Sequence, residues 1–220
     1  MKIVFVSLFP HLISPYFEDS ILKKAKDKGL FSIEFVNFRE FSLNKHKKVD
    51  TSIVGGGAGM IIDNIALRNA LSYLKEKYPS SRTIFLTPVG KKFNQKDAVR
   101  FSKEEVLILV SGRYEGFDER VVEDFADEVI SIGDFILTGG ELASLVVADS
   151  TLRNIKGVLG NENSLKEESF NEGLLEAPSF SKMGEVPSLL KSGNHLKIRK
   201  WKEATSLLKT KYHRPDLIIK

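Results

Sequence analysis

The feature that most constrains the fold is an alternation of short apolar runs with helix-forming segments through residues 1–160. Two runs, at 1–7 and 106–111, are apolar at nearly every position, which indicates strands buried on both faces. Further strands are predicted at 31–38, 83–88 and 127–133. Strands that alternate with helices predict an α/β domain with a mostly parallel sheet, covered by helices on both faces.

Most of the predicted helices begin at or near an Asp or Asn residue. Such a side chain can accept a hydrogen bond from the first free amides of a helix. Four helices of this kind are predicted, and a longer fifth helix is predicted at 140–155. The four cover residues 19–28, 63–75, 94–102 and 118–125.

After residue 160 the character of the sequence changes. Residues 161–168 (NENSLKEE) are polar and lack a periodic apolar pattern, so a mobile linker is predicted there. Residues 169–220 carry spaced apolar positions and predict a small helical domain. A core built from about 50 residues is marginal, so this domain is expected to pack on another surface.

Composition excludes several kinds of site. The chain has no cysteine, which rules out disulfides, thiolate catalysis and cysteine-ligated zinc, and its four histidines are scattered. Any metal would therefore be bound by oxygen atoms. No apolar run approaches the ~20 residues that cross a bilayer, and the opening segment lacks a small-residue cleavage site. A cytoplasmic protein without a membrane partner is expected.

The charge of the chain is concentrated at its C-terminal end. Residues 191–220 hold nine Lys or Arg and two acidic residues, while the net charge of the whole chain is +4. A basic end of this kind predicts a polyanion as partner, although a solvated helix face would show the same run of charges.

Three glycine-rich loops indicate where chemistry could occur: GGGAGM at 55–60, SGRYEGF at 111–117 and IGDFILTGGE at 132–141. Two of them directly follow predicted strands, and glycine lets a ligand approach the backbone closely, which predicts a pocket at the strand ends. The dinucleotide fingerprint GxGxxG does not fit, because Met60 stands where its last glycine would be, and no GxxxxGK[ST] occurs. Taken singly, each loop could also be an ordinary turn.

Taken together, the motifs resemble those of the bacterial tRNA (guanine-N1)-methyltransferases. GGGAGM, SGRYEGFDERV, ISIGDFILTGGEL, IKGVLGNENSLKEESF and SGNHLKIRKW follow one another in the order and approximate spacing of that family, over nearly the whole chain. The resemblance implies an α/β domain with a deep C-terminal trefoil knot over residues 1–160, which connectivity rules alone would argue against. Residues 169–220 would form the basic domain that binds tRNA.

The resemblance also implies the ligands and partners. The cofactor would be S-adenosylmethionine, held in a bent shape by the loops of the knot, with Mg²⁺ assisting through ligands that the sequence does not identify. The active form would be a homodimer with its site at the subunit interface. The substrate would be the anticodon arm of tRNA, methylated on the guanosine immediately 3′ of the anticodon and preceded by another guanosine.

The site residues that the resemblance implies fall into two sets. For the cofactor pocket they are Leu86, Thr87, Pro88, Gly112, Tyr114, Glu115, Ile132, Gly133, Phe135, Leu137, Gly139 and Gly140. Glu115 is expected near the sulfonium or a magnesium ion, although it could equally cap its loop. Contacts with tRNA are expected at Asp50, which could also be a turn residue, and at Gly57, Ser192, Asn194, His195, Arg199 and Lys200.

The reaction itself requires a base and a cation, because guanine N1 carries a proton and negative charge builds toward O6 as that proton leaves. The resemblance implies Arg153 as the cation. It implies Glu168 as the base, at a position where the family usually has aspartate. A glutamate is one methylene longer, so the neighbouring Glu167 is an alternative base.

One segment departs from the family pattern. SFSKM at 179–183 replaces the family's HYTRP, with Lys182 in place of arginine, which leaves the contacts of this segment with the anticodon arm open. Trp201 is expected in the core of the small domain rather than stacked on a base.

Two other functions stay open from the sequence. A related knotted methyltransferase that modifies rRNA or a ribose hydroxyl would not need a carboxylate base at Glu168. A non-catalytic RNA-binding protein could keep the glycine loops as a scaffold.

Overall fold

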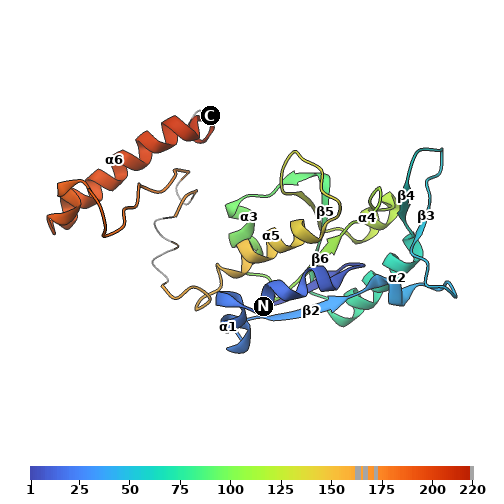
Figure 1. Cartoon of the computed structure of the whole chain (residues 1–220). Coiled ribbons are helices and arrows are strands. Elements are labelled where there is room, and N and C mark those ends of the chain that lie inside the picture. The colour runs from blue at the N-terminus through green and yellow to red at the C-terminus, as the bar shows by residue number, and fades with distance from the viewer. Residues whose placement is uncertain (162–164, 166–167, 171–172, 219–220) are drawn as a thin grey trace. The chain divides into compact units, whose positions relative to one another are not determined.

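The computed structural model describes residues 1–161, 165, 168–170 and 173–218 (Figure 1). The chain divides into two compact units, Met1–Gly160 and Asn161–Lys220. The first unit is an α/β structure, and the second contains one long helix.

The first unit is centred on a five-stranded sheet in the order β2-β1-β6-β5-β7, in which every pair of neighbouring strands is parallel. All carboxyl ends of the strands therefore lie at one edge of the sheet, which is where parallel sheets bind ligands. This arrangement confirms the predicted mostly parallel sheet. The strands are β1 (Lys2–Val6), β2 (Ser32–Val36), β5 (Arg82–Lys92), β6 (Val106–Ser111) and β7 (Glu128–Ser131).

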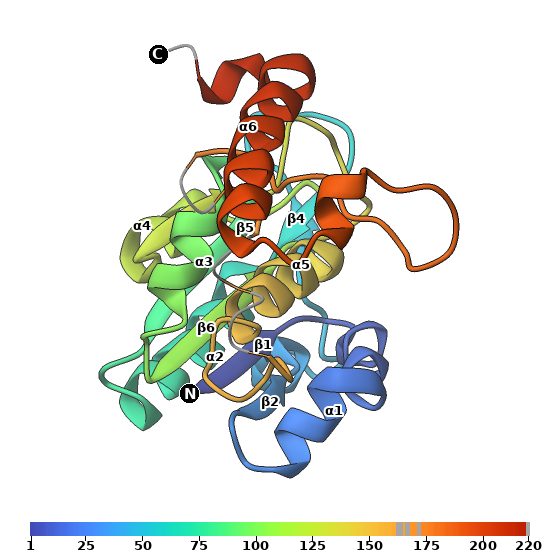
Figure 2. The ribbon, with the colours of Figure 1, turned by 90° about the vertical axis from the view of Figure 1, so that its left-hand side faces the viewer.

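Helices cover both faces of the sheet. One face packs against α1, α5 and α3, which follow one another across it in that order in Figure 2. The other face packs against α2 and α4. The bounds of these helices are α1 (Ser20–Asp27), α2 (Asn64–Lys77), α3 (Gln95–Phe101), α4 (Glu119–Phe125) and α5 (Glu141–Leu152). Three short 3-10 helices also lie in the first unit: η1 (Pro10–Leu12), η2 (Ser14–Phe17) and η3 (Phe38–Phe41).

The predicted capping residues do begin these helices. The side chain of Asp63 accepts a hydrogen bond from Ile65 N at 2.7 Å, and that of Asp118 accepts one from Arg120 N at 3.0 Å. Asn94 forms a reciprocal capping box with Asp97 at the start of α3. The helix starts predicted from the sequence are thus confirmed to within one or two residues.

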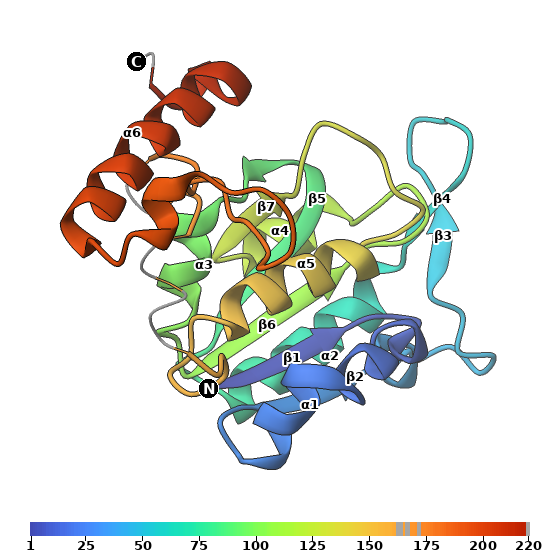
Figure 3. The same cartoon turned by 60° about the vertical axis from the view of Figure 1, so that its left-hand side comes forward.

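A short antiparallel hairpin was not predicted. It pairs β3 (Asp50–Ser52) with β4 (Met60–Ile62) and carries the first glycine-rich loop between them. Each strand has only three residues, too few to show an apolar alternation that sequence reasoning could detect. Figure 3 shows the hairpin standing out from the body of the first unit.

Strand β5 runs four residues beyond its predicted end. Leu86 and Lys91 both lie opposite Ile130 on β7, so the intervening residues 87–90 form a loop within the strand. A Cβ atom on Gly90 would lie 2.6 Å from Ile130 N and from Val129 C, so only glycine can pass there. The knot implied by the resemblance stays a prediction.

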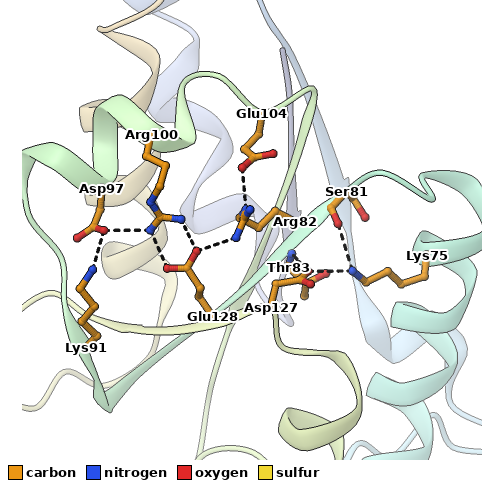
Figure 4. Close-up of polar contacts among 10 residues, drawn as sticks. All are labelled: Lys75, Ser81, Arg82, Thr83, Lys91, Asp97, Arg100, Glu104, Asp127 and Glu128. Carbon is orange, nitrogen blue, oxygen red and sulfur yellow. Dashed lines mark hydrogen bonds and ion pairs between the residues drawn. The ribbon is translucent and has the colours of Figure 1, made fainter.

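A network of charged side chains holds the first and the last part of β5 to α3 and β7 (Figure 4). Arg100 Nη2 lies 2.7 Å from Glu128 Oε2 and 3.0 Å from Asp97 Oδ1. Arg82 Nη1 donates to Glu128 Oε1 at 3.0 Å, and Lys91 Nζ donates to Asp97 Oδ1 at 2.9 Å. The network therefore connects the strand on both sides of the loop at 87–90. Hydrogen bonds from Arg100 hold the pKa of Glu128 below its ordinary value.

The second unit contains α6 (His195–His213), with η5 (Ser188–Lys191) before it and η6 (Pro215–Leu217) after it. Thr210 is buried, and its Oγ1 accepts a hydrogen bond from Leu175 N at 2.9 Å, which attaches the preceding segment to the helix. Trp201 is partly buried, and its ring lies 6.2 Å from that of Phe180. Among the described helices of both units, none is long and apolar enough for a membrane span.

Candidate active site

A pocket of about 250 Å³ lies at the carboxyl ends of β5, β6 and β7. This volume is close to the lower end of small-molecule pockets, which hold ~300–1,000 Å³. All the predicted cofactor residues except Phe135 line it: Leu86, Thr87, Pro88, Gly112, Tyr114, Glu115, Ile132, Gly133, Leu137, Gly139 and Gly140. The fold thus brings together residues that are up to 54 positions apart in the sequence, while their role as ligands of a cofactor stays a prediction.

Phe135 lies in the third loop without lining the pocket. Its side chain is about half exposed, and its ring packs on Gly133, where a Cβ atom would clash with Cε1 of the ring. Gly133 also has a φ of +154°, so both its backbone and its surroundings favour glycine.

The second and third loops are joined backbone to backbone. Gly140 N donates a hydrogen bond to Gly112 O at 2.8 Å. A Cβ atom on Gly140 would lie 2.7 Å from Gly112 N, so a side chain at this position would push the two loops apart. Gly112 and Gly140 therefore allow the second and third loops, which form two walls of the pocket, to lie in direct backbone contact.

A buried ion pair lies beside this junction. The carboxylate of Glu141, the first residue of α5, is only 4% exposed, and its Oε2 lies 3.0 Å from Arg113 Nε. The two atoms are in ionic contact without forming an aligned hydrogen bond. Ser7 Oγ donates to Oε1 of the same carboxylate at 2.7 Å. A buried charge without a partner lowers the stability of the fold, so Arg113 and Glu141 hold each other in position.

Arg113 makes two further contacts. Its Nη1 donates to Thr138 O at 3.1 Å, and its guanidinium carbon lies 4.8 Å from the ring centre of Phe9. Arg113 thus connects the second loop with the third loop and with the segment after β1. Sequence reasoning missed Arg113 and Glu141, although both stand beside the glycines of the motifs.

The first glycine loop is attached to the second loop through the hairpin. Glu115 N donates to Met60 O at 2.9 Å, and Ile62 N donates to Gly116 O at 3.2 Å. The carboxylate of Glu115 lies against Gly59, where a Cβ atom would be 2.5 Å from Oε1. All three loops that the sequence singled out are therefore neighbours.

The two predicted catalytic residues lie in different units. Arg153 caps the C-terminal end of α5, where its N–H donates to Asp149 O at 3.1 Å. The pocket lies at the other end of α5, and twelve helical residues separate the two ends by about 18 Å. Glu168 is a partly buried residue of the second unit, and Glu167 lies outside the described residues.

The predicted tRNA contacts lie at three places. Asp50 begins β3 and is partly buried, and Gly57 is exposed in the loop between β3 and β4. Ser192, Asn194 and His195 are exposed around the start of α6, where the Asn194 side chain accepts a hydrogen bond from Lys197 N at 3.1 Å.

The two predicted cationic contacts follow on α6. Arg199 and Lys200 are both exposed. Arg199 Nε lies 3.0 Å from Glu203 Oε1, an exposed pair that contributes little to stability. Lys182, in the segment that departs from the family pattern, is also exposed.

In the described part of the chain, no three His, Cys, Asp or Glu residues are grouped so that they could hold a metal ion. Glu115 is one carboxylate in this neighbourhood, which does not form a metal site by itself.

Comparison with known proteins agrees with the resemblance over the full length. The profile of the family described as "tRNA (Guanine-1)-methyltransferase TrmD" matches residues 1–220. A tRNA (guanine-N(1)-)-methyltransferase of a Nitratiruptor species is 55% identical over 98% of this chain and 97% of its own length. Proteins of the same name from a Sulfurovum species and from Wolinella succinogenes are 53% and 54% identical. Both matches cover 100% of this chain, together with 99% of the length of the Sulfurovum protein and 95% of that of the Wolinella protein. The chain therefore belongs to the tRNA (guanine-1)-methyltransferase TrmD family.

Proposed function

We propose that this protein transfers the methyl group of S-adenosylmethionine to N1 of the guanosine immediately 3′ of the anticodon in tRNA. The observation that carries the proposal is the pocket at the ends of β5, β6 and β7, which two of the family motifs, SGRYEGF and IGDFILTGGE, line together with residues 86–88 at the bend of β5. The names of the relatives support the guanine and the tRNA as substrate.

The residues of the pocket fit this cofactor. A flat adenine ring can lie against the apolar side chains of Leu86, Ile132 and Leu137. The backbone of the glycines is accessible to polar edges of the base, and Glu115 offers a negative charge to a cationic sulfur. When bound, S-adenosylmethionine supplies a methyl group on a positively charged sulfur, which is a good leaving group.

In the proposed mechanism Glu168 removes the proton from guanine N1. The N1 lone pair then forms a bond to the methyl carbon while the bond from that carbon to sulfur breaks. The products are N1-methylguanosine and S-adenosylhomocysteine, and the proton stays on the carboxylate until it passes to water. Glu168 thus acts as a general base.

Arg153 stabilises the negative charge that builds on O6 during proton removal. A guanidinium suits this task because it stays charged at all physiological pH values and presents a planar set of donors. Ala143 lines the pocket, and the ten residues from Ala143 to Arg153 span about 15 Å along α5, which is more than an arginine side chain reaches. Arg153 therefore does not act at the pocket of its own chain.

We propose that Arg153 acts at the pocket of a second copy of the chain. This arrangement requires a homodimer. Leu142 and Val146, one turn apart on α5, are 60% and 44% exposed, and such exposed apolar side chains are suited to an interface. Tyr16 on η2 donates a hydrogen bond to Asp149, which also lies on α5, so η2 extends this surface.

The proposal includes no step through Mg²⁺. Among the described residues, no group of three potential ligands could hold a metal ion by itself. Since Mg²⁺ is usually held by one or two carboxylates together with substrate oxygens and water, a magnesium ion in the reaction would need ligands from the substrates as well.

The proposed function is tested by incubating the full-length protein with unmodified tRNA transcript and isotopically labelled S-adenosylmethionine, followed by mass spectrometry of the nucleosides. We expect label in N1-methylguanosine. Label in a ribose-methylated nucleoside would favour a related methyltransferase with another target. A transcript with adenosine in place of the target guanosine serves as the control, and equal labelling of it would contradict the mechanism.

Calorimetry separates the enzyme from a non-catalytic RNA-binding protein. We expect saturable binding of S-adenosylmethionine to the folded protein, and the absence of binding would exclude the proposal.

A further inference from the structure

A short basic segment of the first unit is not explained by the pocket. Residues 42–48 (SLNKHKK) follow η3 and lead into β3, and we call them the basic loop. Residues 43–48 are all exposed. The loop carries three lysines and a histidine in a unit where acidic and basic residues are otherwise nearly balanced.

The basic loop has one defined conformation. Ser42 Oγ donates to Lys48 O at 2.7 Å and closes the loop. Inside it, the Asn44 side chain accepts from His46 N at 2.8 Å, and Asn44 O accepts from Lys47 N at 2.8 Å. Lys47 has a φ of +50°, an unfavourable backbone conformation for a residue with a side chain.

Both ends of the loop are anchored in the fold. Before it, Phe41 O accepts a hydrogen bond from Asn69 on α2 at 3.2 Å. After it, Val49 is fully buried and its carbonyl accepts from Asp63 N at 2.8 Å. The fold therefore holds the basic loop in one conformation before a partner binds, so little conformational entropy is lost on binding.

Two of the lysines offer their charges to solvent. Lys47 pairs with Glu40 in an exposed ion pair. Among the described residues, neither Lys45 nor Lys48 has a hydrogen-bonding or ionic partner through its ammonium group. A fixed loop that keeps unpaired cations at its surface suits a polyanion with regularly spaced charges.

The basic loop also lies close to the walls of the pocket. Lys48 is two residues from Asp50, about 7 Å along extended chain. Asp50 pairs with Ile62 across the hairpin, and Ile62 N binds Gly116 O at 3.2 Å. An RNA strand whose target nucleotide enters the pocket can therefore run along the hairpin. Phosphates only a few nucleotides from the target can then reach the basic loop.

We propose that the basic loop binds phosphate groups of the RNA substrate through Lys45 and Lys48, beside the nucleotide that is methylated. The inference rests on the proposed function for the identity of the RNA. It adds an RNA-binding surface in the first unit to the basic helix α6 of the second.

The test is the salt dependence of binding of an unmodified tRNA transcript to the full-length protein. Each phosphate contact contributes about 0.7–0.9 to the slope of log affinity against log salt concentration. We expect the Lys45→Ala/Lys48→Ala variant to bind more weakly and to lose about 1.4–1.8 units of this slope. Calorimetric affinity for S-adenosylmethionine should stay unchanged.

Two variants serve as controls. Lys24→Ala/Lys28→Ala removes the same charge from exposed positions at the C-terminal end of α1. This end leads into the start of β2, at the edge of the sheet opposite to the carboxyl ends of the strands. The variant should keep the wild-type slope. Lys45→Arg/Lys48→Arg keeps the charge and should also keep the slope, which separates lost contacts from a disturbed loop.

An unchanged slope in the alanine variant, or an equal loss in the α1 control, would overturn the inference. A lost slope in the arginine variant would overturn it as well. Failure of the proposed function gives a different result: tRNA binding would depend on the loop while the wild-type protein forms no N1-methylguanosine.

Discussion

Arg113 Nε lies 3.0 Å from Glu141 Oε2, and this ion pair connects the second glycine-rich loop with the first turn of α5. The pair stands directly behind Gly139, where a Cβ atom would clash with Arg113 Nε. The charged pair and the glycine therefore depend on each other, and together they fix the wall of the pocket that the third loop provides.

Replacing Glu141 by glutamine should destabilise the protein. Removal of one charge from a buried pair leaves the other uncompensated, which costs about 3–5 kcal/mol of unfolding free energy. We expect weaker binding of S-adenosylmethionine in the same variant because the wall is no longer fixed. Chemical denaturation and calorimetry measure the two effects.

Glu119→Gln is the matched control for this variant. Glu119 is likewise the first residue of a helix, α4, but it is exposed. Its replacement should cost less than about 1 kcal/mol. Equal effects in the two variants would show that the helix position, and not the buried ion pair, is responsible.

Gly90→Ala should destabilise the first unit by about 1–3 kcal/mol or more, because the new methyl group meets the backbone of β7. Gly160→Ala is the control, since a Cβ atom there meets nothing within 4 Å. Thermal unfolding of the two variants checks the prediction. A Gly90→Ala protein as stable as the wild type would mean that the loop at 87–90 can move aside.

Arg153→Ala should lower kcat by about 10²–10³, the usual cost of losing one group that stabilises a developing oxyanion. Affinity for S-adenosylmethionine should stay nearly the same, because the proposed role of Arg153 is at O6 of the guanine and not at the cofactor. Lys156→Ala, which removes an exposed cation three residues away, should keep its activity. Steady-state methylation of tRNA measures both variants. An equal loss of activity in the two would contradict the role assigned to Arg153.

Glu168→Gln should reduce methylation by about 10²–10⁴, because an amide cannot accept the proton of guanine N1. Glu167→Gln should keep most of the activity and serves as the control. Single-turnover rates with labelled tRNA distinguish the two residues. If Glu167→Gln is inactive and Glu168→Gln is not, the base is the neighbouring glutamate.

The ion-pair network around Glu128 predicts a loss of stability in acid. Hydrogen bonds from Arg100 lower the pKa of Glu128 in the folded state below its ordinary value of 4.5. The unfolded chain therefore binds more protons in this range, and stability rises with pH. The contribution is complete above about pH 4.5 and is lost as the pH falls through the lowered pKa.

Comparison with Glu128→Gln measures this contribution. We expect the variant to be about 1–2 kcal/mol less stable at neutral pH, a modest value because the pair is partly exposed and screened by solvent. The difference should shrink during acid titration. A difference that stayed constant down to about pH 2 would contradict the assignment.

Several features of the fold follow from local sequence. The apolar runs at 1–7 and 106–111 form the interior strands β1 and β6, because a segment that is apolar at nearly every position is suited to burial on both faces. Asp63, Asn94 and Asp118 begin helices because their side chains satisfy free amides next to them in the chain. Such effects act over a few residues, so they can be read without a structure. The motif loops also indicated where the pocket would lie.

Tertiary structure alone decided how these pieces meet. The contact of Arg113 with Glu141 joins residues 28 positions apart, and the close approach of Gly90 to Ile130 spans 40. The place of Arg153, at the end of α5 that points away from the pocket, likewise depends on the direction of α5. Sequence spacing does not determine such distances, because they depend on which strands pair and on how the loops close over the sheet edge. The sequence by itself therefore determined most of the helices and strands and the family, because those signals are local, and the packing of the loops determined the shape of the site.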